Sequence, residues 1–77
     1  MSILISLNEI KDLYQFVKEI TDMPCDIDAF HNHYVIDAKS ILGLMSLTLS
    51  EPITVRINTD DEKLIKQFED ICLKYQP

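Results

Sequence analysis

The spacing of the hydrophobic residues changes several times along these 77 residues, and this change restricts the fold more than any other feature. Apolar and polar side chains alternate in segments 25–29 and 53–57, and in segment 2–7 Ile3, Ile5 and Leu7 alternate with Ser2, Leu4 and Ser6, which is the period of a half-buried strand. Between these segments, apolar residues return every three or four positions, as they do on a helix. The pattern predicts an α+β domain in which helices cover one face of an antiparallel sheet.

The first helix is predicted from about Glu9 to Thr21. Asn8 is a good capping residue at its start, and acidic residues in the first turn suit the positive end of the helix dipole. The apolar residues that recur at helical spacing are Ile10, Leu13, Val17 and Ile20.

A β-hairpin is predicted around Asn32. In the strand before it, aspartates alternate with apolar residues, so the acidic side should face water. Asn32 tolerates a left-handed turn conformation, and a β-prone run resumes at residues 34–36.

The second half of the chain predicts a short helix, a strand and a long helix. Ser40 can cap the short helix, which is rich in large apolar residues. Thr59 and Glu62 have the spacing of a capping box at the start of the last helix. The whole chain, 1–77, is expected to form one domain with the order β-α-β-β-α-β-α. The apolar stripe of the last helix is predicted to be Leu64, Ile65, Phe68, Ile71 and Cys72.

Charge and hydropathy exclude several kinds of function. The net charge is -6, from 13 acidic and 7 basic residues, and Arg56 is the only arginine, so we expect no direct binding to nucleic acid. No apolar run reaches the roughly 20 residues that span a bilayer, and no secretion signal is evident, so we expect a cytoplasmic protein that does not bind membranes. Cys25 and Cys72 are then expected to be free thiols.

The segment from Val35 to Ser50, VIDAKSILGLMSLTLS, resembles the region of HPr phosphocarrier proteins that contains a regulatory serine and a short second helix. The segment LYQFVKEIT lies where the first helix of that family would be. The resemblance implies an HPr-like open-faced β-sandwich, with four antiparallel strands covered on one face by three helices. It also implies a place in or near the bacterial phosphoenolpyruvate:sugar phosphotransferase system, without a cofactor.

The resemblance fails at the family's phosphohistidine. Counting back from Ser40 without gaps, Glu9 holds the position of that histidine, and the following positions differ as well. An imidazole accepts a phosphoryl group from an anionic donor. A carboxylate at the same helix start would repel that donor. We therefore expect a non-catalytic, regulatory protein. The alternatives are a functional phosphocarrier that uses a non-standard acceptor, which could include an acyl phosphate on Glu9, and an unrelated interaction module on the same fold.

The resemblance implies that partners dock on the second helix and on the adjoining part of the first. The expected partners are phosphotransferase-system enzymes, the serine kinase or the catabolite regulator, and the protein itself is expected to be a monomer or a weak dimer. Phosphorylation of Ser40 would add negative charge to this face, whereas a plain helix cap is the simpler interpretation of that serine. Burial under the sheet is the simpler interpretation of the apolar residues. The predicted partner-binding residues are Lys11, Tyr14, Ile41, Leu42, Met45 and Leu47.

His31 and His33 have the spacing that points two side chains to one side of a strand. Two ligands do not complete a metal site, and polar turn residues are the simpler interpretation, so we expect no metal. We also expect both histidines to lie at the opposite end of the second strand from the start of the first helix, which would make them poor substitute phosphoryl acceptors.

Overall fold

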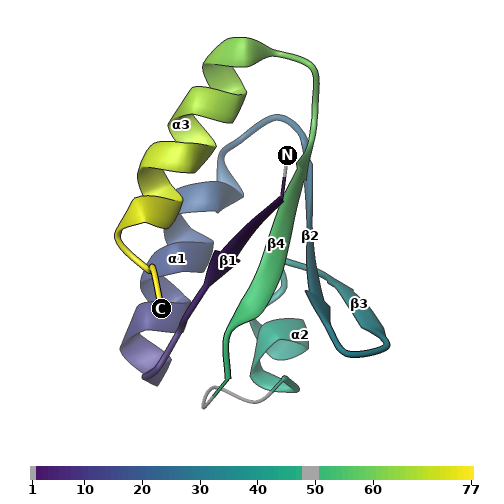
Figure 1. The fold of residues 1–77 in the computed structure, drawn as a ribbon, viewed down its shortest axis with the longest axis vertical. Coiled ribbons are helices and arrows are strands. Elements are labelled where there is room, and N and C mark those ends of the chain that lie inside the picture. The colour runs from purple at the N-terminus through teal and green to yellow at the C-terminus, as the bar shows by residue number, and fades with distance from the viewer. Residues whose placement is uncertain (1, 48–50) are drawn as a thin grey trace.

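The structure is a computed structural model that describes residues 2–47 and 51–77, in which three helices lie on one side of a four-stranded sheet (Figure 1). The strands are ordered β1-β4-β2-β3, and each neighbouring pair is antiparallel. The predicted fold class and element order are confirmed. In chain order the elements are β1 (Ser2–Ile5), α1 (Ile10–Thr21), β2 (Asp26–His31), β3 (Tyr34–Asp37), α2 (Ile41–Met45), β4 (Ile53–Asn58) and α3 (Glu62–Leu73).

The strand register places apolar residues opposite one another on the side of the sheet that faces the helices. Val55 on β4 pairs with Ile3 on β1 and with Ala29 on β2. Ala29 pairs in turn with Ile36 on β3. The period-two pattern therefore selects one buried face across all four strands.

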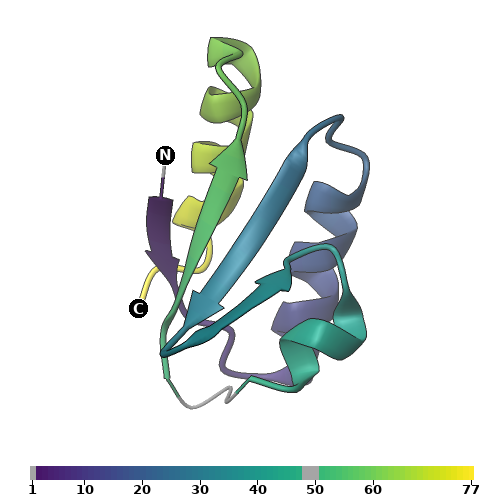
Figure 2. The same cartoon turned by 90° about the vertical axis from the view of Figure 1, so that its right-hand side faces the viewer.

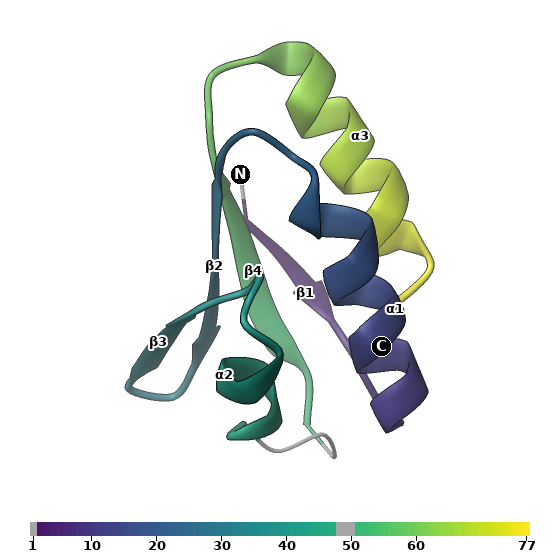
Figure 3. The same ribbon diagram turned by 180° about the vertical axis from the view of Figure 1, so that it is seen from behind.

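Helices α1 and α3 lie side by side over this face (Figure 3). Phe16 of α1 and Phe68 of α3 are fully buried, and the ring of Phe16 packs edge-on against the ring of Tyr75. Removing each such side chain from water stabilises the fold by about 1.5–3 kcal/mol. No helix in the described part of the chain is long and apolar enough to cross a membrane.

Both long helices begin later than the sequence predicts. Glu9, and not Asn8, is the N-cap of α1, and its side chain makes no capping hydrogen bond. Asn8 instead accepts a hydrogen bond of 3.0 Å from the Ser6 hydroxyl through its side-chain oxygen. The N-cap of α1 was therefore predicted wrongly by one residue, because Asn8 serves the turn before the helix.

The predicted capping box of the last helix is also wrong. The N-cap of α3 is Asp61, whose carboxylate accepts a hydrogen bond of 2.9 Å from the Lys63 backbone N–H. The Thr59 hydroxyl accepts from the Asp61 N–H at 3.1 Å, so Thr59 shapes the preceding turn. Strand β4 pairs with β2 as far as Asn58, and a short turn at residues 59 and 60 separates it from the helix cap at Asp61.

The β2–β3 hairpin forms where it was predicted. Asn32 has a φ of 54°, the left-handed conformation that a tight turn requires. The hairpin lies at the same end of the molecule as the start of α1 (Figures 1 and 2). The expectation that the histidines would lie at the opposite end was wrong, because α1 and β2 run in opposite directions and return the chain to that end.

Candidate docking site

The short helix α2 depends on a close contact between Ser40 and Gly43. The Gly43 backbone N–H donates a hydrogen bond of 3.0 Å to the Ser40 hydroxyl, so Ser40 is the N-cap that the sequence predicts. A Cβ atom on residue 43 would lie 3.2 Å from the Ser40 oxygen and 3.4 Å from Cδ1 of Ile36. Glycine therefore allows the capping serine and strand β3 to approach the helix closely.

Helices α1 and α2 contact each other, and α2 lies beside the end of the molecule where α1 begins (Figure 2). Apolar side chains on both helices face water, and Leu42 has the highest exposure of these at 81%. Ile10 and Tyr14 are also exposed, and their i,i+4 spacing places them on one side of α1. We group the exposed residues of the two helices, together with the partly buried Ile41, under the name α1–α2 face: Ile10, Lys11, Tyr14, Ile41, Leu42 and Met45.

The predicted docking residues differ in their burial. Lys11, Tyr14, Leu42 and Met45 are exposed, and Ile41 is partly buried against the core. Leu47 is only 7% exposed and belongs to the core, so it does not contribute to this face. Sequence reasoning missed the exposure of Ile10, which its spacing from Tyr14 could have indicated.

The start of α1 presents an exposed carboxylate and no imidazole. The Glu9 carboxylate lies 3.6 Å from the Lys11 ammonium, and both side chains are largely in water, so the pair adds little stability. The Glu9 carbonyl accepts hydrogen bonds from the backbone N–H groups of Asp12 and Leu13 and so begins the helix. Negative charges at this position interact favourably with the positive end of the helix dipole, and they repel an anionic phosphoryl donor.

The two histidines lie in the β2–β3 hairpin and differ in their surroundings. His31 ends β2, its side chain is 13% exposed, and its Nε2 atom lies 3.1 Å from a carboxylate oxygen of Glu51. His33 lies in the turn and is exposed. Residues 2–47 and 51–77 contain no cluster of three or more potential metal ligands among histidine, cysteine, aspartate and glutamate.

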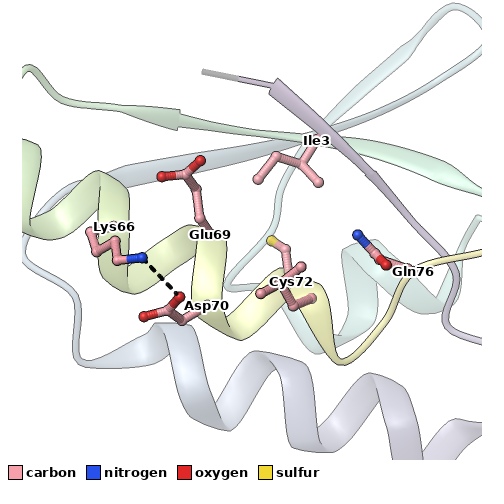
Figure 4. A pocket seen from close by; sticks show the side chains of 7 residues that line it. Ile3, Lys66, Glu69, Asp70, Cys72 and Gln76 are labelled. Carbon is pink, nitrogen blue, oxygen red and sulfur yellow. Dashed lines mark ion pairs between the residues drawn. The ribbon is translucent and has the colours of Figure 1, made fainter.

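A cavity of about 280 Å³ lies between β1 and α3, and the residues that line it come from these two elements and from Gln76 (Figure 4). Ile3 lines it from the strand, and the ion pair between Lys66 and Asp70, 3.7 Å apart, lies along its rim. Burial raises the pKa of the Cys72 thiol to about 12, so this cysteine is not a nucleophile at neutral pH. The charged side chains that line the cavity are Lys66, Glu69 and Asp70.

Solved structures similar to this one are HPr proteins. HPr-C-His from Thermoanaerobacter tengcongensis matches with a TM-score of 0.75 and 22% identity, over 96% of this chain and 92% of that one. The phosphocarrier protein HPr from Bacillus anthracis matches with a TM-score of 0.73 and 21% identity, over 99% and 96%. The histidine-containing phosphocarrier protein from Mycoplasma matches with a TM-score of 0.70 and 15% identity, over 96% and 93%. At these identities the likeness establishes the fold.

A search of curated protein sequences finds no match to this chain. The family model described as the PTS HPr component phosphorylation site matches residues 13–72. The match does not include Glu9, the residue that counting back from Ser40 aligns with the family's histidine. Because the match covers well over half of the sequence, the chain belongs to the HPr family of the phosphotransferase system.

Proposed function

We propose that this chain is a non-catalytic, cytoplasmic HPr-like regulatory protein. It docks through the α1–α2 face on partners from the phosphotransferase system or from carbon regulation, and phosphorylation of Ser40 controls that docking. The protein carries out no phosphoryl transfer of its own on this proposal, because the start of α1 holds Glu9 where the family has a histidine.

The observation that carries the proposal is the retained apolar surface beside an altered helix start. Leu42 and Met45 on α2 and Tyr14 on α1 remain exposed, although burying them would stabilise the fold. Large apolar side chains gathered in water mark a surface that binds another protein, and methionine adapts well to such contacts. A phosphocarrier needs its nucleophile, whereas a docking protein needs only this surface.

Ser40 is placed to regulate this surface. Its hydroxyl caps α2, and Leu42 lies two residues further along the same short helix. A phosphoryl group would add nearly two negative charges next to an apolar docking surface. Phosphorylation of Ser40 would therefore strengthen binding to partners that place cationic groups beside this residue and weaken binding to partners that place apolar groups there.

A binding assay with matched variants tests the docking proposal. Purified enzyme I, the serine kinase and the catabolite-control regulator would each be titrated by calorimetry with the wild type, Leu42→Ser and Leu73→Ser. Both leucines are exposed, but Leu73 lies on α3, outside the α1–α2 face. We expect Leu42→Ser to weaken binding by about tenfold or more and Leu73→Ser to leave it unchanged.

The same assay tests the role of Ser40. The kinase should phosphorylate the wild type and not Ser40→Ala, and the phosphorylated protein should bind at least one partner with altered affinity. If the protein bound none of the three partners, with or without phosphate on Ser40, the proposal would be contradicted. Normal binding by Leu42→Ser would show that another surface is used.

One observation favours a second function, that of a phosphocarrier with a non-standard acceptor. His31 lies 3.1 Å from Glu51, an arrangement in which a carboxylate orients an imidazole, and the hairpin lies at the end of the molecule where α1 begins. The protein would be incubated with phosphoenolpyruvate and enzyme I and analysed by mass spectrometry at mildly alkaline pH. A phosphoryl adduct that His31→Ala loses and His33→Ala keeps would support this function and overturn the proposal above.

A further inference from the structure

The side of the sheet opposite the helices carries a row of three large apolar residues and one threonine among polar neighbours. The register joins Leu4 to Thr54, Thr54 to Phe30 and Phe30 to Val35, so these side chains cross all four strands in one line. Leu4 is 51% exposed and Val35 is 60% exposed, and the two central residues are partly buried. We call this line the open-face row.

The open-face row breaks the pattern expected of a sheet with one side in water. Such a sheet normally alternates apolar residues toward the core with polar residues toward solvent. The other outward residues follow this rule, and they are Ser2, Asp26, Asp28, Asp37, Arg56 and Asn58. The row spans three strand spacings, or about 14 Å. Three large apolar side chains that line up on a side of the sheet otherwise made of polar residues are typical of a contact surface.

Carboxylates border the open-face row on one side. Asp28 pairs with Asp37 across β2 and β3, and Asp26 lies further along the same outward side of β2. Arg56 on β4 faces the same side and pairs with Asp28, so the bordering residues carry more negative than positive charge. A partner that covers the row must therefore bring apolar side chains together with cationic groups along one edge.

We propose that the open-face row binds an amphipathic helix of another protein, with leucine-like residues on the row and lysine or arginine residues against Asp26, Asp28 and Asp37. A row of about 14 Å matches about nine residues of helix at a rise of about 1.5 Å each. Helices already cover the other side of this sheet, so the partner helix completes a third layer. The sheet separates this surface from the α1–α2 face, and both can be occupied at once.

Two synthetic peptides test the proposal. Both place leucine at helical spacing, and the remaining positions are lysine in one peptide and glutamate in the other. Each peptide would be titrated into isotopically labelled protein and followed by NMR. We expect the leucine–lysine peptide to bind and to shift the amide signals of β1, β4, β2 and β3, and we expect the leucine–glutamate peptide not to bind.

Paired variants separate this site from general attraction to an acidic protein. Asp28→Asn/Asp37→Asn and Asp22→Asn/Glu62→Gln each remove two carboxylates, but only the first pair borders the row. Asparagine keeps the oxygens that accept from Asn58 and from the Lys39 backbone N–H. We expect the first pair to weaken binding about tenfold and the second pair to change it by less than about twofold. Val35→Ser should also weaken binding, and Leu42→Ser should not.

Four outcomes would overturn the proposal. The first is no binding of the leucine–lysine peptide, and the second is an equal loss of affinity in the two carboxylate pairs. The third is a set of NMR shifts confined to α1 and α2. The fourth is self-association of the protein without peptide, measured by sedimentation and lost in Val35→Ser, which would assign the surface to a second copy of this chain.

Discussion

The hydroxyl of Tyr75 donates a hydrogen bond of 2.6 Å to a carboxylate oxygen of Glu19, and the other carboxylate oxygen accepts from the Lys74 ammonium. The Tyr75 carbonyl also accepts a hydrogen bond of 2.6 Å from the Ser6 backbone N–H. Residues near the end of the chain are thereby joined to α1 and to the segment that follows β1. Because Tyr75 is buried and packs on Phe16, these bonds hold α1 against the rest of the core.

Tyr75→Phe should lower the free energy of unfolding by about 1.5 kcal/mol, since it removes a hydrogen bond to a charged group and keeps the ring. Urea denaturation followed by circular dichroism would measure the change. Tyr14→Phe is the matched control, because the Tyr14 side chain is exposed and its change should stay within about 0.5 kcal/mol. Equal stabilities of Tyr75→Phe and the wild type would contradict the role assigned to this bond.

Glu19 should make stability depend on pH on the acid side. Burial alone would raise its pKa, but hydrogen bonds from Lys74 and Tyr75 outweigh burial and hold the pKa below the ordinary value of 4.5. A lowered pKa gives stability that is present above the unfolded-state pKa and is lost as the pH falls through the folded-state pKa. The wild type should therefore lose this contribution below about pH 4.5.

Glu19→Gln should show a smaller loss of unfolding free energy between about pH 6 and about pH 3 than the wild type. Tyr75→Phe should reduce the loss in part, because it removes one of the hydrogen bonds that lower the pKa of Glu19. Urea denaturation at a series of pH values would measure both effects. The same acid dependence in Glu19→Gln and in the wild type would rule out this source of acid sensitivity.

Gly43→Ala should fail to give the gain of about 1 kcal/mol that this change brings in an ordinary helix. The new methyl group would crowd the Ser40 hydroxyl, and moving that hydroxyl would break the cap on the Gly43 N–H. The loss of unfolding free energy caused by Gly43→Ala should therefore be about 1 kcal/mol smaller in a Ser40→Ala background than in the wild type. Denaturation of the four proteins would give this coupling, and additive changes would show that the two residues act independently.

Cys25 and Cys72 are unpaired in the structure and should react at different rates. Alkylation proceeds through the thiolate, and the raised pKa and burial of Cys72 leave it little thiolate and little access. Native protein treated with iodoacetamide at neutral pH should gain one adduct at Cys25, and unfolded protein should gain two. Peptide mass spectrometry would locate the adducts. Equally fast reaction of Cys72 in the native protein would contradict its burial.

Much of the fold could be predicted because its signals are local. The order of strands and helices follows from the spacing of apolar residues within short windows. Asn32 forms its turn through its own backbone conformation, and Ser40 caps a helix through a hydrogen bond only three residues away. Most of the candidate site was also within reach, since exposed Leu42 and Met45 lie in the segment that resembles the HPr family. The assignment of Glu9 to the position of the family's histidine rests on counting along the chain and stays a prediction.

The remaining features required the arrangement of distant segments. Asp61, and not Thr59, caps α3, and the Thr59 hydroxyl instead accepts a hydrogen bond from the Asp61 N–H in the turn after β4. Leu47 is buried and Ile10 is exposed although both are large and apolar, since burial depends on which element covers a side chain.

Residue type and spacing along the chain are enough to predict the elements, their order and the lack of a histidine at the start of α1. Contacts between distant segments set which apolar residues remain in water and which distant residues meet. They join Glu19 to Tyr75, bring the hairpin to the end of the molecule where α1 begins, and align Leu4 with Val35 across the sheet. These features follow from strand register and helix packing, which depend on pairs of segments and are therefore contained in no local window of the sequence.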